Sequence, residues 1–219
     1  MSVASFAHHG LWTVDAVLAL PEDRTTRYEL LGESLVVSPA PGLRHQRASF
    51  RLHVALEAAA RAADAPVEIL EAINVILPSG LVVPDIVVAD AGATAQDAVS
   101  IDADAVRLVI ELVSPGNKLM DRKLKPLLYA EAAVPHYWRL EFDPAPRLIC
   151  SELDRGRYVE TATALPGAVT SLTKPYAFEI DPAGLAQPGA ETQPAADSES
   201  RGAGRLRVLY CGSYTSRSP

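Results

Sequence analysis

The chain has 219 residues, 48% of them hydrophobic, which suffices for one domain with a sizeable core and some excess length. Its formal net charge of −7 argues against non-specific nucleic-acid binding through bulk charge, although a locally basic cleft is compatible with it. No apolar run approaches the roughly 18 residues that span a membrane, and we expect no secretory signal, because no basic segment followed by an apolar one occurs near the first residue. We therefore expect a cytoplasmic protein without membrane association, with Cys150 and Cys211 reduced.

The first third of the chain predicts two helices around a hairpin. Residues 1–10 have the character of a frayed terminus, and Thr13 is a good N-cap for a short helix that Pro21 ends. A longer helix follows, with an apolar face that includes Phe50 and Val54. The expected elements are helices Val14–Leu20 and Leu43–Ala63 and hairpin strands Tyr28–Leu31 and Ser34–Val37.

The middle of the chain contains short runs rich in β-branched residues, which predict three strands. These runs are Val67–Leu77, Leu81–Ala89 and Val106–Val113, and a polar loop, Asp90–Asp104, separates the last two. The third run is apolar apart from Arg107 and Glu111. Near-continuous apolar runs are typical of central strands that are covered on both faces.

The last predicted helix, Leu119–Ala132, contains Pro126, so it is either kinked there or begins late with Pro126 in its first turn. Strand His136–Phe142, hairpin Leu148–Leu153 with Arg157–Thr163, and short strand Tyr176–Ile180 follow. Residues 181–219 are rich in Pro, Ala, Gly, Ser and Thr and predict a disordered tail. The whole order indicates an α/β domain over residues 11–180, with a mixed sheet flanked by helices.

Two acids lie at or inside the apolar central strands. Asp85 follows Pro84 at the start of an Ile-Val-Val-Ala run, and Glu111 interrupts the run Val106–Val113. A carboxylate is costly to bury in such a strand unless it is paired or binds a metal. If the two strands are neighbours, both side chains converge at one sheet edge, where oxygen ligands suit Mg²⁺ or Mn²⁺. The backbone carbonyl of Leu112 would be a natural further ligand.

A bound ion of this kind polarises a phosphodiester and activates water, and a nearby lysine could orient or deprotonate that water or stabilise developing charge. Lys118, Lys123 and Lys125 all follow Glu111 closely. Structural explanations remain open at this level. Asp85 could be a turn acid, Glu111 could pair with Arg107 or Lys125, and the basic run could be a solvated helix face. Tyr137-Trp138 suits a core position better than a stacking platform.

Five motifs follow one another in order: Tyr28-Glu29-Leu-Leu-Gly32-Glu33, Ser38-Pro-Ala-Pro41 with His45, Val83-Pro-Asp85-Ile-Val-Val, Val109-Ile-Glu111-Leu-Val-Ser114-Pro115 with Asp121, Lys125 and Tyr129, and Val134-Pro-His-Tyr137-Trp138. With these five motifs in this order, the chain resembles the Uma2 family, also called DUF820, which is a branch of the PD-(D/E)XK nuclease superfamily. The resemblance covers about residues 11 to 165. It implies a restriction-endonuclease-like core, DNA as substrate, and a homodimer.

The resemblance also implies roles for single residues. Asp85 and Glu111 correspond to the metal-binding acids, joined by the Leu112 carbonyl. The superfamily's lysine usually lies two residues after the second acid, where this chain has Val113, so the matching residue becomes Lys125 on the next helix. The supporting residues that the resemblance implies are Glu29, His45, Asp121 and Tyr129.

Two functional hypotheses follow. The first is a Mg²⁺- or Mn²⁺-dependent endonuclease that hydrolyses DNA, with Asp85, Glu111 and Lys125 as catalytic residues. The alternative is a nuclease-fold module without activity that binds nucleic acid or a protein partner, which Val113 and Pro126 favour. A Lys125 ammonium group close to both acids would support the first hypothesis, and a solvent-facing Lys125 the second. A cysteine nucleophile is set aside, because Cys150 lies in a predicted hairpin without a predicted base.

Overall fold

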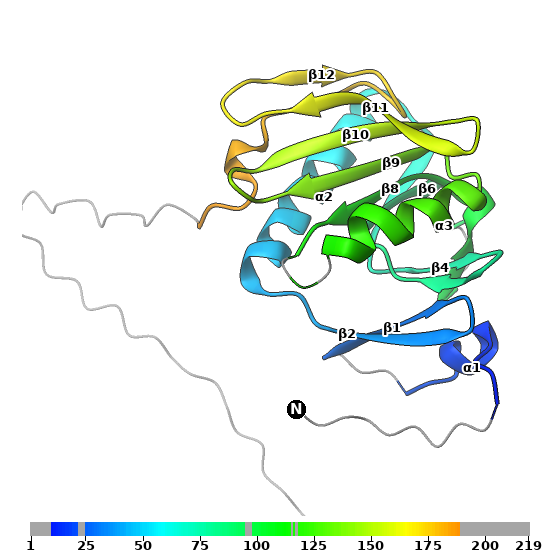
Figure 1. Ribbon diagram of the computed structural model, residues 1–219. Helices are drawn as coiled ribbons and strands as arrows, with labels where there is room; N and C mark the ends of the chain where they lie inside the picture. The colour runs from blue at the N-terminus through cyan, green and yellow to red at the C-terminus, as the bar shows by residue number, and fades with distance from the viewer. Residues whose placement is uncertain (1–9, 22–24, 95–97, 115, 117, 189–219) are drawn as a thin grey trace, which may run out of the picture. The chain divides into compact units, whose positions relative to one another are not determined.

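The computed structural model describes residues 10–21, 25–94, 98–114, 116 and 118–188. Its main element is a mixed six-stranded sheet in which β8 and β9 are parallel and the other neighbours antiparallel (Figure 1). Its strands in spatial order are β11 (Arg157–Ala164), β10 (Arg147–Asp154), β9 (His136–Glu141), β8 (Val106–Leu112), β6 (Ile86–Asp90) and β3 (Val67–Glu71). The expected α/β fold with a mixed sheet flanked by helices is confirmed.

The central strands β6 and β8 are buried on both faces, as their apolar runs predicted. Ile86 belongs to the core beneath one face, whereas its neighbour Val87 belongs to the core on the other. In β8, Ile110 and Val109 divide in the same way. Because side chains alternate along a strand, the parity of each position fixes which core it enters.

Helix α2 (Leu43–Ala62) covers one face of this sheet, and α3 (Lys125–Glu131) lies on the other (Figure 1). The buried face of α2 carries Ala48, Leu52, Leu56 and Ala60 at four-residue spacing, with small residues that allow close approach to the sheet. The expectation that Phe50 and Val54 belong to the buried face was wrong, since both are largely exposed.

A second, five-stranded sheet lies beside the first on the α3 side. Its β4 and β7 are parallel and its other neighbours antiparallel. Its order is β2 (Ser34–Pro39), β1 (Thr26–Leu31), β5 (Gly80–Val82), β4 (Asn74–Leu77) and β7 (Ser100–Asp102). The remaining elements are α1 (Val14–Leu18), the pair β12 (Thr170–Leu172) and β13 (Phe178–Ile180), and the single turns η1 (Ala103–Ala105) and η3 (Pro182–Gly184).

Two of the predicted strands are each divided between the two sheets. Val67–Leu77 breaks at Ala72, whose φ of 52° turns the chain out of the first sheet, so that β3 and β4 have different partners. Leu81–Ala89 breaks at Pro84, which has no N–H for a strand ladder, into β5 and β6. The predicted loop 90–104 contains β7, and α1 ends at Leu18 rather than Leu20.

The helix that contains Pro126 begins before it with a π-helical turn, η2 (Met120–Leu124), and continues as α3. Proline lacks the N–H of a regular turn and crowds the carbonyl four residues earlier, and a wider turn relieves both conflicts. Pro126 therefore falls in the first turn of α3, one of the two alternatives that the sequence left open. This arrangement turns Lys125 toward the sheet, where its side chain is buried.

Residues 181–188, which the sequence assigned to the tail, instead pack on the domain. They form η3, where the Asp181 carboxylate accepts a hydrogen bond from the Ala183 N–H at 2.9 Å. Leu185 and Ala186 are buried in the same core as Leu56. The predicted terminus 1–9 and the rest of the predicted tail, 189–219, lie outside the described residues.

Candidate metal and catalytic site

Asp85 and Glu111 lie side by side on adjacent antiparallel strands. The register pairs Ile86 of β6 with Ile110 of β8, so one further step places Asp85 opposite Glu111. Asp85 shares the parity of Val87, and Glu111 that of Val109, so both acids face the α3 side. The condition that the sequence analysis set for convergence of the two acids, that their strands are neighbours in one sheet, is therefore met.

The Asp85 carboxylate is buried, and both of its oxygens have polar partners. It accepts hydrogen bonds from Arg27 Nη1 at 2.6 Å and from the Leu112 N–H at 2.8 Å, and its Oδ2 lies 3.0 Å from His45 Nε2. Burial alone would raise its pKa, but the hydrogen bonds and positive charges of His45 and Arg27 outweigh burial and lower the pKa to about 2. Asp85 is therefore ionised at neutral pH.

Glu111 is the centre of a second buried cluster. Its Oε1 accepts hydrogen bonds from Lys125 Nζ at 3.0 Å and from the Tyr129 hydroxyl at 2.6 Å. Burial raises the pKa of Glu111 to about 8, because the nearby carboxylates reinforce the loss of solvation and Lys125 only partly offsets it. A positive ligand in this site would therefore favour the ionised form of Glu111.

Lys125 joins this cluster to the second sheet. Its Nζ lies 2.9 Å from Glu29 Oε1 on β1, and the same oxygen accepts a hydrogen bond from the Val83 N–H at 2.9 Å. Although burial opposes its charge, Glu111 and Glu29 hold the pKa of Lys125 well above its ordinary value. Lys125 is thus a buried, permanently charged ammonium group and does not face solvent.

Asp121 lies on η2, one turn before Lys125, and is only 4% exposed. Among the residues that the structure describes, none donates a hydrogen bond to its carboxylate. Burial raises its pKa to about 7, and the carboxylates of Asp85 and Glu29 add to the rise, whereas Lys125 opposes it. This side chain is the least satisfied acid of the cluster.

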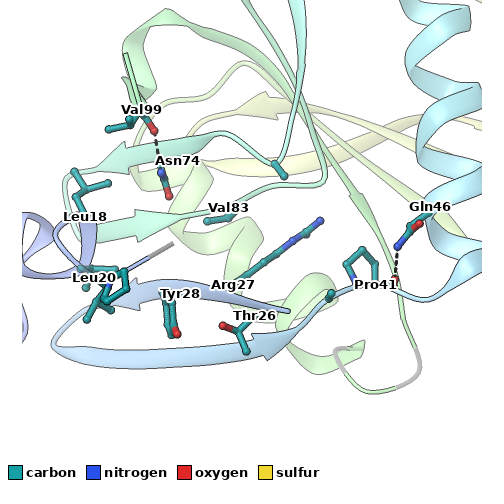
Figure 2. A pocket seen from close by; sticks show the side chains of 14 residues that line it. Leu18, Leu20, Thr26, Arg27, Tyr28, Pro41, Gln46, Asn74, Val83 and Val99 are labelled. Atoms are coloured by element: carbon teal, nitrogen blue, oxygen red, sulfur yellow. Dashed lines mark hydrogen bonds between the residues drawn. The ribbon is translucent and has the colours of Figure 1, made fainter. Parts of the chain in front are cut away.

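All of these acids line one cavity of about 360 Å³ between β1, β6, β8 and η2. A neighbouring cavity of about 510 Å³ lies between α1, β1 and β4 and shares Arg27 and Val83 with the first. Figure 2 shows the Arg27 side chain extending from β1 past Val83 at this boundary. In the second cavity Asn74 donates a hydrogen bond to the Val99 carbonyl, and Gln46 donates one to the Pro41 carbonyl.

The oxygen donors around the first cavity have the chemistry of a divalent-ion site. Four carboxylates and the main chain of Leu112 border the first cavity, and hard oxygen donors of this kind suit Mg²⁺ or Mn²⁺. Within the described ranges no group of three or more His, Cys, Asp or Glu residues is arranged to hold an ion by itself. The residues therefore fit an ion that takes one or two carboxylates and keeps several waters, rather than a closed protein cage.

The structure brings all eight predicted site residues, Leu112 included, to this cavity or to a residue that lines it. His45 contacts Asp85, Glu29 contacts Lys125, and Tyr129 contacts Glu111. Arg27 was not predicted as a site residue, although it precedes Glu29 by two residues and residues i and i+2 of a strand share a face. That spacing was the available signal.

Tyr137, Trp138 and Cys150 are buried residues of the domain and not part of the cavity. Trp138 and Tyr137 are core residues, since both are nearly fully buried and Trp138 stacks on Phe178 with ring centroids 5.8 Å apart. Cys150 is buried, and burial raises its pKa to about 12, so it carries no thiolate for nucleophilic attack. Cys211 lies outside the described residues.

Among the described helices none is long and apolar enough to cross a membrane.

Residues 14–183 match the model of the Uma2 family, whose description reads "Putative restriction endonuclease". Among solved structures, the chain is similar to a "putative nuclease belonging to DUF820" from Anabaena variabilis ATCC 29413. The two share 17% sequence identity with a TM-score of 0.61, over 74% of this chain and 89% of the other. No protein with curated annotation matches. The homodimer stays an expectation, because neither description mentions one.

Proposed function

Because this chain belongs to the Uma2 family, we propose that it is an endonuclease that hydrolyses DNA phosphodiester bonds with Mg²⁺ or Mn²⁺ as cofactor. The observation that carries the proposal is the adjacency of Asp85 and Glu111 on β6 and β8, with the Lys125 ammonium group 3.0 Å from Glu111. Paired acids and a cation in one cavity are the parts that phosphodiester hydrolysis needs.

In this proposal Asp85, Glu111 and the Leu112 carbonyl hold the ion. When bound, Mg²⁺ or Mn²⁺ would polarise the scissile phosphate and lower the pKa of a coordinated water. The ionised state of Asp85 at neutral pH prepares it as the first ligand. Among the described residues, the hydrogen bonds to Glu111 are both made to Oε1, which leaves Oε2 for the ion.

Lys125 would act as a cation rather than as a base. Its pKa is held above the ordinary lysine value, so the ammonium group keeps its proton at neutral pH. A fixed positive charge in a poorly solvated cavity stabilises negative charge that develops on the phosphate and orients the attacking water. Among the roles that the sequence left open for the lysine, we assign this one to Lys125 in preference to proton abstraction.

The remaining residues would position these groups. Tyr129 fixes the Glu111 carboxylate through its hydroxyl, and Glu29 fixes the Lys125 ammonium group. His45 holds one oxygen of Asp85. Asp121 faces the same cavity with no donor of its own among the described residues, so it is suited to accept a hydrogen bond from the attacking water.

A binding module without activity is the second candidate. The observation that favours it is that both Asp85 oxygens are already occupied, by Arg27, His45 and the Leu112 N–H. An ion pair of this kind satisfies a buried acid without any metal. On this alternative the cavity is a remnant of the nuclease fold, and the protein binds nucleic acid or a partner protein.

Nicking of supercoiled plasmid tests the proposal. The wild type is incubated with Mg²⁺ or Mn²⁺ beside D85A, E111A and the isosteric K125M, with metal-free and EDTA-treated samples. We expect metal-dependent conversion to the open circle that is lost in D85A and E111A and falls by at least about 100-fold in K125M. Cleavage by the wild type no greater than by the acid variants, on double- and single-stranded DNA, would favour the binding module.

A further inference from the structure

Three arginines surround one buried carboxylate on the same face of the sheet as Glu111. Glu141 of β9 is 3% exposed and accepts hydrogen bonds from Arg122 on η2, through Nε at 2.9 Å and through Nη2. Arg139 Nε lies 3.6 Å and Arg147 Nη2 3.5 Å from its oxygens. One negative charge thus faces three positive ones, which leaves a local excess of two positive charges in a chain whose net charge is −7.

Arg122 and Arg139 line a cavity of about 360 Å³ between η2–α3 and strands β9 to β11. Lys123 and Arg157 line it as well, and Glu160 is its one acidic residue. Within the described part of the chain, neither Lys123 nor Arg157 has a salt-bridge partner. The cavity wall therefore carries four cationic side chains against one carboxylate, which is the electrostatic character of an anion site.

This basic cavity lies on the opposite side of one helix from the acid cavity, the cavity that Glu29, Asp85, Glu111 and Asp121 line. Asp121 and Lys125 face the acid cavity, whereas Arg122 and Lys123, between them in sequence, face the basic one. Figure 1 shows α3 lying across the sheet, with β9 and β10 to one side of it and β1 and β2 to the other. A helix with its side chains is about 10 Å wide, and each strand of duplex DNA carries one phosphate per 3.4 Å or so of the duplex axis.

We infer that the basic cavity binds the sugar–phosphate backbone of a nucleic-acid strand two to four nucleotides away from the phosphate in the acid cavity. This inference rests on the proposed function for the identity of the ligand, because a strand whose phosphate enters the acid cavity has further phosphates within reach of Arg122 and Lys123. Arginine forks match phosphate oxygens, and the excess charge of the Glu141 cluster keeps guanidinium donors available. The contact is to backbone and carries no base sequence preference.

Equilibrium DNA binding in EDTA tests this inference separately from cleavage. The probe is a fluorescein-labelled 20-base-pair duplex, with its single strand in parallel, and anisotropy is followed from 50 to 200 mM NaCl. The test variant is K123E with R157E, which reverses two exposed charges that form no ion pair with any described residue. The control is R61E with K174E, which changes the net charge equally at exposed positions that do not line either cavity.

We expect K123E/R157E to weaken binding by more than about tenfold at 50 mM NaCl and to reduce the salt slope by about two. The control pair should change affinity by less than about threefold. Equal losses in both pairs, or no DNA binding by the wild type, would overturn the inference. Since no metal is present, binding that depends on Lys123 and Arg157 supports it even if the plasmid assay finds no cleavage. Cleavage with binding insensitive to these residues rejects this inference alone.

Discussion

Arg27 and Asp85 form a 2.6 Å ion pair at the boundary of the two neighbouring cavities. The pair joins the two sheets, since Arg27 lies on β1 and Asp85 directly precedes β6. The negative charge of Asp85, the proposed metal ligand, is therefore already neutralised by Arg27, whose side chain is only partly buried. An ion that binds Asp85 must therefore compete with the guanidinium group.

Replacing Arg27 by glutamine should strengthen metal binding. One unit charge within about 5 Å of a divalent ion, at an effective dielectric constant near 20, opposes binding by more than about 1.4 kcal/mol. We expect the affinity of R27Q for Mn²⁺, measured by isothermal titration calorimetry without DNA, to exceed that of the wild type by at least about tenfold. R107Q, which breaks the Arg107–Asp90 pair outside the cavity, is the matched control. Unchanged or weaker Mn²⁺ binding by R27Q would show that the Arg27 guanidinium group does not compete with the ion for Asp85.

Replacing Lys125 by methionine should destabilise the fold strongly. The change leaves Glu111 and Glu29 buried without their cation, and removal of one partner from a buried pair costs about 3–5 kcal/mol. Adding E111Q should restore part of that loss, with a coupling free energy of about 1 kcal/mol or more. Urea unfolding of both single variants and the double variant measures it. Strictly additive losses would show that the two side chains do not depend on each other.

Asp121 makes stability fall as pH rises. Its folded-state pKa of about 7 is raised above the unfolded value of 3.8, so the folded state binds its proton more tightly. That contribution is present at and below pH 4 and is lost as pH rises toward 7. We expect D121N to match the wild type near pH 4 and to be more stable at pH 8, by on the order of 3 kcal/mol. Urea unfolding at pH 4, 6 and 8 measures the difference, and a gain independent of pH would exclude this origin.

The core of the site was predictable because its strands follow a simple pattern. Acids in near-continuous apolar runs are expected to be paired or functional, and such runs are typical of central strands, so Asp85 and Glu111 stood out as candidates. That their strands are neighbours is shown only by the register of β6 against β8. The position of Lys125 followed only from the family resemblance. Spacing alone could not show that a π-helical turn before Pro126 would point Lys125 into the cavity rather than to solvent.

The division into two sheets was not predictable from the same patterns. The chain leaves the first sheet at Ala72 with a positive φ, and alanine gives no signal for that conformation. The basic cavity was missed for a related reason. Arg122 and Arg139 belong to η2 and β9, and only the packing of that helix on the sheet brings them to one cavity. Long-range pairing of this kind is set by the packed fold and not by local sequence.

Ala133 marks the position where a glycine should stabilise the protein. It follows α3 with φ 57°, and the next residue's N–H donates a hydrogen bond to the Tyr129 carbonyl at 3.0 Å, a helix ending that glycine usually supplies. A left-handed non-glycine residue is strained by about 1–2 kcal/mol, and the greater freedom of glycine in the unfolded chain offsets part of the gain. We expect A133G to raise the free energy of unfolding by about 0.5–1 kcal/mol in urea titrations.

The neighbouring Ala132 supplies the control, because its φ of −76° is ordinary for a helix end. A132G gains nothing from relief of strain and should lower stability by about 0.5–1 kcal/mol. Both variants lose the same methyl group, so changes of opposite sign in their free energy of unfolding would come from the difference in backbone conformation between residues 132 and 133. If both variants lost stability equally, the left-handed turn at residue 133 would carry no strain. Since that turn ends the helix that holds Lys125, plasmid nicking by A133G should stay within about twofold of the wild type.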